Sequence, residues 1–192
     1  AFNRNYLKEQ VVILGEVDND ILLMKSNRYG EMEWQQSFGG SQMDIASHIE
    51  QASDGGFIIS ATTESYGQGG KDIWLFKTSS SGLIEWNKYI GTPYDDYSGQ
   101  VLETDDGGFI LIGSRGSSDQ NDNDIWLIKT NSQGDSSWTR SYGGNQFDRG
   151  NDILADDQGG FILWGRTESQ GNGGKDIWLL NVDEDGTEQG NR

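Results

Sequence analysis

The feature that most constrains this chain is a pattern that recurs every 52 residues. An aspartate followed by Ile, a hydrophobic residue and Leu begins at Asp20, Asp72, Asp124 and Asp176. Glycines keep the same step at Gly30, Gly82, Gly134 and Gly186. A fixed period near 50 residues is typical of propellers, solenoids and other repeat arrays, so the architecture follows from the repeat before any local assignment.

Within one period, the sequence predicts four short strands and no helix. In the second copy these strands cover residues 44–50, 57–61, 73–77 and 84–89, with Asp-Gly-Gly and Ser-Gly turns between them. The third strand is apolar on both faces, as in a strand covered by neighbouring sheets on both sides. Twenty-eight glycines and a single proline fit many tight turns. We therefore predict an all-β protein, a β-propeller of four blade-like repeats of four antiparallel strands.

The repeat boundaries divide the chain into units of residues 1–40, 41–92, 93–144 and 145–192, which we expect to form a single domain. Two strand positions are vacant, the inner strand of the first unit and the outer strand of the last, and residues 2–8 offer a strand for only one of them. In the last unit Gly190 stands where the earlier outer strands carry Trp34, Trp86 and Trp138. Three arrangements remain open: a four-bladed ring with an imperfect seam, part of a larger ring, and a homodimer whose two copies complete one ring.

Charge excludes some partners. The formal net charge is −17, with only 14 Lys and Arg side chains. Nucleic-acid phosphates and anionic membranes need clustered positive charge, so neither is an expected partner. No apolar run is long enough to insert in a membrane. The chain has no cysteine and one histidine, which excludes disulfides, a catalytic thiol and zinc sites made of Cys and His.

Four short motifs recur in order along the repeats: Asp-Gly-Gly-Phe-Ile, Asp-Ile-Trp-Leu-x-Lys-Thr, Gly-x-x-x-Trp and Tyr-Gly-Gly. They resemble the repeats of about 50 residues found in bacterial and archaeal secreted or cell-surface β-propeller proteins. The Gly-x-x-x-Trp element is also distantly similar to the tryptophan-docking motif of quinoprotein-type propellers. The resemblance implies an extracellular or cell-surface location and a binding or scaffold role.

Three aspartates in the connections between units are candidate metal ligands, namely Asp44, Asp96 and Asp148. In a closed ring they would surround one face, where carboxylates could hold Ca²⁺ or a hydroxyl-rich sugar. The competing interpretation is a repeated turn residue that accepts hydrogen bonds from nearby backbone. No other cofactor is expected.

Ligand contacts are expected where the repeats differ, because loops on a rigid frame commonly carry function. The loops between the second and third strands are long and polar at residues 63–71, 114–123 and 167–175, whereas the first unit has only residues 16–19 there. From these loops we select Tyr66, Arg115, Asp119, Asp122 and Arg166 as ligand-binding candidates. His48, with counterparts Gln100 and Asp152, offers an inner-strand polar site near the channel, but the preferred interpretation is a polar residue on a solvated inner strand.

The sequence singles out no catalytic residue. The main functional prediction is a non-enzymatic extracellular binding or scaffold module that recognises a glycan or protein through loops on one face. One alternative is a purely structural propeller segment of a larger surface protein. Another is an enzyme of the quinoprotein or glycosidase type, since a chain with 31 acidic residues has many carboxylates from which a catalytic pair could form.

Overall fold

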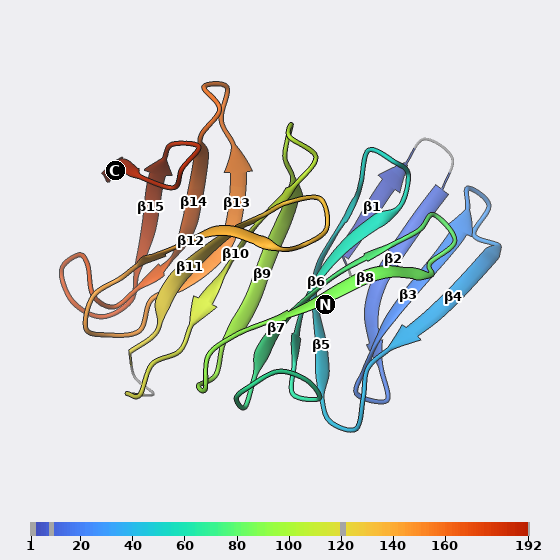
Figure 1. The fold of residues 1–192 in the computed structure, drawn as a ribbon, viewed down its shortest axis with the longest axis horizontal. Coiled ribbons are helices and arrows are strands. Elements are labelled where there is room, and N and C mark those ends of the chain that lie inside the picture. The colour runs from blue at the N-terminus through green and yellow to red at the C-terminus, as the bar shows by residue number, and fades with distance from the viewer. Residues whose placement is uncertain (1–2, 8–9, 120–121, 192) are drawn as a thin grey trace.

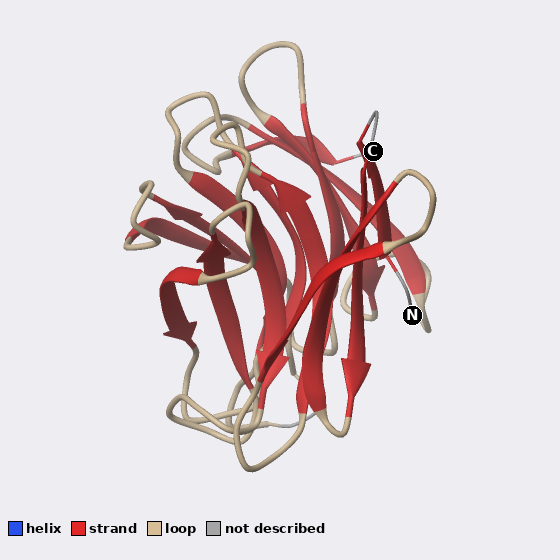
Figure 2. Cartoon of the chain, turned by 90° about the vertical axis from the view of Figure 1, so that its right-hand side faces the viewer, coloured by secondary structure: helices blue, strands red, loops and turns tan. Residues whose placement is uncertain are grey.

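The computed structural model describes residues 3–7, 10–119 and 122–191. All regular structure in these residues is β-strand, and Figure 2 shows the strands joined by loops without a helix. The first sheet contains β1 (Asn3–Leu7), β2 (Gln10–Val17), β3 (Asp20–Asn27) and β4 (Met32–Phe38). The second contains β5 (Asp44–Gln51), β6 (Phe57–Thr63), β7 (Asp72–Thr78) and β8 (Ile84–Ile90).

The third sheet contains β9 (Tyr97–Glu103), β10 (Phe109–Arg115), β11 (Asp124–Thr130) and β12 (Ser136–Tyr142). The fourth contains β13 (Arg149–Ala155), β14 (Phe161–Thr167), β15 (Asp176–Val182) and β16 (Glu188–Asn191). Each sheet is an antiparallel meander in which sequential strands pair. The prediction of four antiparallel four-stranded repeats is confirmed, and the strands of the second unit agree with their predicted positions to within two residues.

The ends of the chain complete their own sheets. β1 pairs with β2 and is the inner strand of the first sheet, so the N-terminal segment fills one of the two vacant positions. β16 pairs with β15 at the outer edge of the fourth sheet. The four sheets follow one another along the molecule, with the first and last sheets at opposite ends (Figure 1). In the described residues, the extensive contacts between sheets join consecutive sheets and do not join the first to the last.

Three apolar clusters hold the sheets together, one at each boundary between consecutive sheets. At the first boundary, Val12, Leu14, Ile21 and Leu23 face Phe57, Ile59 and Trp74 across the gap. β6 and β7 are buried at every position, because each is covered on both faces by a neighbouring sheet. This explains why the third strand of the second repeat reads as apolar throughout.

A tryptophan on each of the outer strands β4, β8 and β12 contacts a turn glycine of the next sheet. A Cβ added to Gly82 would lie 2.7 Å from the ring of Trp34, and one added to Gly134 would lie 2.5 Å from the ring of Trp86. Both glycines have positive φ, which also favours glycine. The recurring Trp and Gly are therefore the two halves of one contact between neighbouring repeats.

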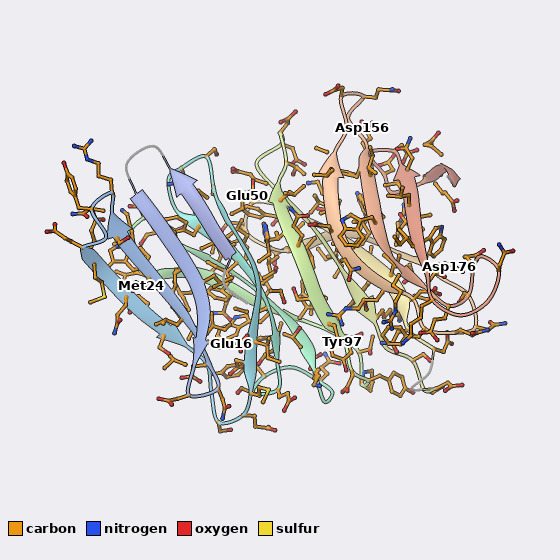
Figure 3. All side chains as sticks on the ribbon, turned by 180° about the vertical axis from the view of Figure 1, so that it is seen from behind. Glu16, Met24, Glu50, Tyr97, Asp156 and Asp176 are labelled. Carbon is orange, nitrogen blue, oxygen red and sulfur yellow. The ribbon has the colours of Figure 1, made fainter. Side chains whose placement is uncertain are left out.

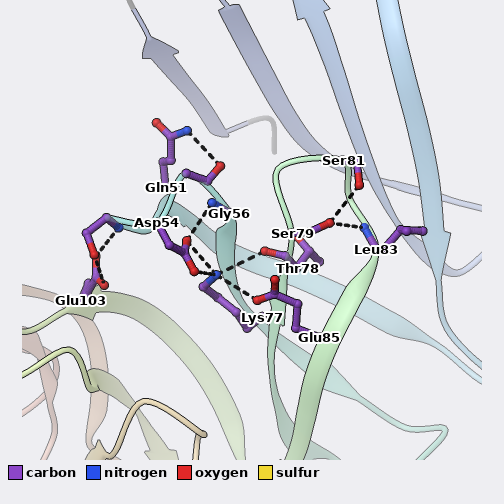
Figure 4. Close-up of polar contacts among 12 residues, drawn as sticks. Gln51, Asp54, Gly56, Lys77, Thr78, Ser79, Ser81, Leu83, Glu85 and Glu103 are labelled. Atoms are coloured by element: carbon purple, nitrogen blue, oxygen red, sulfur yellow. Dashed lines mark hydrogen bonds and ion pairs between the residues drawn. The ribbon is translucent and has the colours of Figure 1, made fainter.

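A buried lysine closes the Asp-Gly-Gly turn of the inner repeats. Lys77 is 4% exposed, and its Nζ donates to Asp54 at 2.7 Å and to Glu85 at 3.2 Å (Figure 4). Lys129 makes the equivalent contact to Asp106 at 2.7 Å. The long stem packs among apolar groups while the ammonium reaches the rim of the sheet. Within the described residues, no helix has the length and hydropathy needed to cross a membrane.

Candidate functional site

The innermost strands of three sheets lie beside one another and enclose a cavity. β9 contacts both β5 and β13, and the cavity between them has a volume of about 590 Å³. Apart from Thr62, its lining comes from the first halves of these three strands, at residues 45–48, 97–100 and 149–152. This volume is within the range of small-molecule sites in proteins.

A β-bulge occurs at the same repeat position in all three inner strands. The pairing register shifts between Ala46 and His48 in β5 and between Gly150 and Asp152 in β13. In β9 the equivalent shift falls between Ser98 and Val101. A bulge places two residues opposite one and redirects the side chains that follow it, and bulges are common beside active sites. Here the residues that follow the bulge are His48, Gln100 and Asp152.

These three residues give the cavity its polar wall. Gln100 Oε1 accepts a hydrogen bond of 2.8 Å from the backbone N–H of Ile153, which fixes its amide against β13. His48 Nδ1 is buried and has no hydrogen-bond partner among the described residues. Burial lowers the pKa of His48, whereas the negative charge of Asp152 and the backbone of Val101 act in the opposite direction. His48 and Asp152 are therefore close enough to interact electrostatically across the channel.

A second acidic group stands further along β5. Glu50 is two residues beyond His48, so both side chains leave the strand on the same face. Burial raises the pKa of Glu50; the backbone of Glu103 opposes the shift and the carboxylate of Glu103 adds to it. Glu50 Oε2 is buried without a partner in the described part of the chain. A carboxyl group in this state keeps its proton to higher pH and can donate it.

The opposite end of the channel is aromatic and cationic. Figure 3 places Tyr97 and Glu50 toward opposite ends of the inner strands. The ammonium of Lys71 lies 5.2 Å from the centre of the Tyr97 ring, and the guanidinium of Arg149 lies 5.7 Å from it. Cations at these distances are attracted to the ring and hold its orientation. Tyr97 and Arg149 both line the cavity.

The proposed metal ligands Asp44, Asp96 and Asp148 are fully buried at the starts of inner strands or just before them. Asp44 accepts hydrogen bonds from Thr63, Ser65 and the backbone of Gly40. Asp96 and Asp148 accept equivalent bonds in their own repeats. Among the described residues, no three acidic or histidine side chains form a group able to hold a metal. These hydrogen bonds favour the interpretation that the three aspartates are repeated turn residues. Burial raises the pKa of Asp96.

The five ligand-binding candidates do not form one site. Tyr66 stacks on Tyr89 with ring centres 4.8 Å apart, and its hydroxyl donates to Gly39. Arg115 lies over the Trp126 ring at 5.7 Å and lines a cavity of about 460 Å³. Arg166 lies over Phe147 and pairs with Glu168.

The remaining two candidates, Asp119 and Asp122, hold their own loop together. The backbone N–H of Asp122 donates to the carbonyl of Asp119 at 2.9 Å, and Ser117 bonds both residues.

Sequence reasoning placed the candidate site on the loops and gave little weight to the channel. The signal was present, because His48, Gln100 and Asp152 occupy one repeat position and differ in every copy. Positions that serve folding recur unchanged in this chain, so a polar position that changes is a marker of function. The bulge that turns these side chains toward the cavity has no sequence signature, which is why the candidate site could not be chosen from the sequence.

No protein-family model matches this sequence, and no curated protein is similar to it. Solved structures share the fold. An endo-arabinase from Bacteroides thetaiotaomicron matches with a TM-score of 0.60 at 12% identity, over 95% of this chain and 75% of the other. A putative exo-beta-1,3-galactanase from Bifidobacterium bifidum matches with a TM-score of 0.54 at 17% identity, over 93% of this chain. This chain spans 65% of the galactanase, slightly less than two thirds.

These comparisons correct the main functional prediction. A non-enzymatic binding or scaffold module was expected, yet both of these similar folds belong to proteins named as glycan-cleaving enzymes. The finding contradicts the non-enzymatic interpretation and favours the glycosidase alternative. The sequence reasoning gave the enzyme little weight because it looked for a conspicuous catalytic pair and found none. The identities of 12% and 17% establish similarity of fold only.

Proposed function

We propose that this chain is a glycosidase-type enzyme whose active site is the channel cavity. The observation that carries the proposal is the cavity itself, in which three bulged inner strands direct His48, Gln100 and Asp152 to one space. The two similar folds, an endo-arabinase and a putative exo-beta-1,3-galactanase, support a polysaccharide or oligosaccharide substrate. Polar and aromatic lining suits a hydroxyl-rich ligand that carries no charge.

Glycoside hydrolysis commonly uses two carboxyl groups, one that gives a proton to the leaving oxygen and one that acts as a carboxylate. Asp152 is the acidic residue among those that line the cavity, and it takes the carboxylate role. Glu50 takes the proton-donor role, because burial raises its pKa and leaves Oε2 without a partner in the described chain. His48, on the same face of β5 as Glu50 and in electrostatic contact with Asp152, positions the pair.

The test is hydrolysis of an arabinan and β-1,3-galactan panel, followed as released reducing ends. Asp152→Asn is expected to lower kcat by at least about 100-fold, within the usual range for acid–base groups. Glu50→Gln is expected to lose hydrolysis of natural glycans but keep more activity on nitrophenyl glycosides, whose leaving group needs less protonation. Asp157→Asn, on an exposed turn, is the control. Full activity of Asp152→Asn would overturn the assignment.

The proposal includes the arrangement of the four sheets around the active site. The four sheets act as consecutive blades of a propeller, with residues 1–192 as one domain and the inner strands around a shared channel. Supporting this, each sheet packs on the next through the same repeat positions. Glycans of the cell exterior are the proposed substrates, which places the protein outside the cell or at its surface, as the repeat resemblance also suggests.

A further inference from the structure

Between the second and third sheets, the connecting loop departs from the repeat. Residues 92–94 read Thr-Pro-Tyr, where the other two connections read Gly-Ser-Gln at 40–42 and Gly-Asn-Gln at 144–146. Pro93 is the sole proline of the chain. Positions that serve folding recur in every copy, so a local cluster of departures on a loop points to a separate use.

The loop is held in one conformation by its own polar contacts. Both the N–H and the hydroxyl of Thr92 donate to the carboxylate of Asp96, and the N–H of Tyr94 donates to Thr92 Oγ1 at 3.2 Å. Pro93 fixes its own φ between them. Tyr94 is nevertheless 43% exposed. A large exposed ring on a rigid loop binds a partner at little cost in conformational entropy.

This loop lies in a series of three adjoining cavities. The channel cavity shares Tyr97 with a cavity of about 330 Å³, and that cavity shares Pro93, Tyr94 and Gly116 with a third of about 460 Å³. The third cavity also contains Arg115. The shared residues make a continuous path from the channel, past Tyr97, to the outer side of Tyr94.

We infer that this path binds the sugars of an extended glycan that lie outside the channel, with Tyr97 and Tyr94 as successive stacking surfaces. The inference rests on the proposed function and deepens it, because it assigns the substrate class as an oligosaccharide longer than the channel holds. Tyrosine suits this role, since its ring offers an apolar face and its hydroxyl a hydrogen-bonding group. Arg115 and Ser117 supply donors for hydroxyl oxygens along the path.

Chain-length dependence tests the inference. Arabinan and β-1,3-galactan oligosaccharides of two to eight sugars are titrated into the protein by calorimetry. Tyr94→Ser is expected to weaken binding of the long oligosaccharides about tenfold and to leave disaccharide binding unchanged. Tyr29→Ser, on an exposed turn of the first sheet, is the matched control. Equal effects on short and long ligands, or no effect on either, would overturn the inference.

The outcomes separate the inference from the proposed function. Hydrolysis of the panel without any effect of Tyr94→Ser removes the path and keeps the enzyme. Length-dependent binding that requires Tyr94, without hydrolysis by the wild-type protein, keeps the path and removes the enzyme. Failure of the wild-type protein both to bind and to cleave any member of the panel overturns both.

A second inference comes from an independent observation at the end of the molecule. The fourth sheet exposes an apolar face formed by Ile162, Trp164, Ile177 and Leu179. Ile177 is 80% exposed. The equivalent face of the third sheet, made by Ile110, Ile112, Ile125 and Leu127, is fully buried against the fourth sheet. The fourth sheet therefore has the same apolar face that the third sheet uses to pack on its neighbour, but no sheet of the described chain covers it.

Among the described residues, no sheet packs on the outward face of the first sheet. Leu22 and Met24 are half-buried there, whereas their counterparts Trp74 and Phe76 are buried against the first sheet. A Cβ added to Gly30 would have nothing within 4 Å, whereas one added to Gly82 or Gly134 would meet a tryptophan of the preceding sheet. The outward face of the fourth sheet is therefore equivalent to the face by which the third sheet packs on the fourth, and the outward face of the first sheet is equivalent to the face by which the second packs on the first. The first and fourth sheets lie at opposite ends of the molecule (Figure 1).

The geometry points to a second copy of this chain as the occupant, with its first sheet packed on the fourth sheet of the first copy. Such a head-to-tail contact continues the internal interfaces and joins copies without a two-fold axis. Position 190 is glycine where the earlier repeats have Trp34, Trp86 and Trp138. The contact between copies therefore lacks the tryptophan that packs on the turn glycine of the next sheet. The association is therefore weaker than the internal contacts and depends on concentration.

Sedimentation velocity from about 1 to 300 µM tests this inference. The wild-type chain is expected to shift from monomer to dimer or ring over this range, and Ile177→Asp to remain monomeric throughout. Leu83→Asp, an exposed change on a turn of the second sheet, is the control and should associate like the wild type. A wild-type protein that stays monomeric at the highest concentration, or Ile177→Asp that associates equally well, would overturn the inference.

Discussion

The contact between Trp86 and Gly134 offers a direct measure of how strongly one repeat holds the next. We predict that Gly134→Ala destabilises the protein much more than Gly30→Ala, although both changes add one methyl group to the same turn. The two turns match closely: each begins with an asparagine, Asn27 or Asn131, whose Oδ1 accepts two backbone N–H groups. Both glycines have positive φ, +84° at Gly30 and +75° at Gly134.

The magnitudes follow from the surroundings of each glycine. Left-handed backbone costs alanine about 1–2 kcal/mol, and this cost is common to both variants. At Gly30 a Cβ meets nothing within 4 Å, whereas at Gly134 it would lie 2.5, 2.8 and 2.9 Å from three ring atoms of Trp86. Forcing the indole away adds about 1–3 kcal/mol of overpacking. The expected losses are about 1–2 kcal/mol for Gly30→Ala and about 2–5 kcal/mol for Gly134→Ala.

Urea unfolding measures both losses as shifts of the midpoint at constant slope. With a slope of about 2 kcal/mol per molar, an extra loss of about 2 kcal/mol lowers the Gly134→Ala midpoint by about 1 M more than the Gly30→Ala midpoint. Trp86→Ala provides the double-mutant cycle, because in its background Gly134→Ala should cost no more than Gly30→Ala does. Equal midpoints for the two alanine variants, or additive losses in the cycle, would refute the steric argument.

Three further predictions concern pH. Lys129 and Thr104 hold the pKa of Asp106 well below its usual range. The stability that ionised Asp106 contributes is therefore complete above the unfolded pKa near 4 and is lost as pH falls through the lower folded pKa. Lys129→Met should make the urea midpoint less dependent on pH between about pH 4 and 2. Burial raises the pKa of Tyr142 to about 12, so absorbance at 295 nm should show a late-ionising tyrosine that Tyr142→Phe removes, and stability should fall between about pH 10 and 12. His48 should titrate by NMR below 6.5, and Asp152→Asn should lower its midpoint further; an upward shift would contradict their electrostatic contact.

Because burial lowers the pKa of His48, the unfolded chain binds its proton at higher pH than the folded chain does. The stability that neutral His48 contributes is therefore present above about pH 6.5 and declines as pH falls toward the lower folded value. Measured urea midpoints for His48→Gln should lose this decline while other acid effects persist.

The sequence by itself determined the 52-residue repeat, the four strands of the second unit and the apolar third strands of the second and third units, which are buried on both faces. It could do so because strand periodicity and turn glycines are local properties, and the 52-residue step repeats the same local information four times. The contact between Trp34 and Gly82 also follows the repeat, although only the structure shows that the two residues belong to adjacent sheets.

Tertiary structure decided the candidate site and the two ends. The cavity forms where three inner strands meet, and residues 52 apart in sequence become neighbours there only when consecutive sheets pack on one another. The bulge before His48, Gln100 and Asp152 comes from strand pairing, which the residues of one strand do not reveal. Whether Ile177 is buried depends on the presence of a further sheet. The sequence of the fourth repeat is similar to that of the second and third. Ile177 is exposed and its counterpart Ile125 is buried because a further sheet covers Ile125 and none of the described sheets covers Ile177.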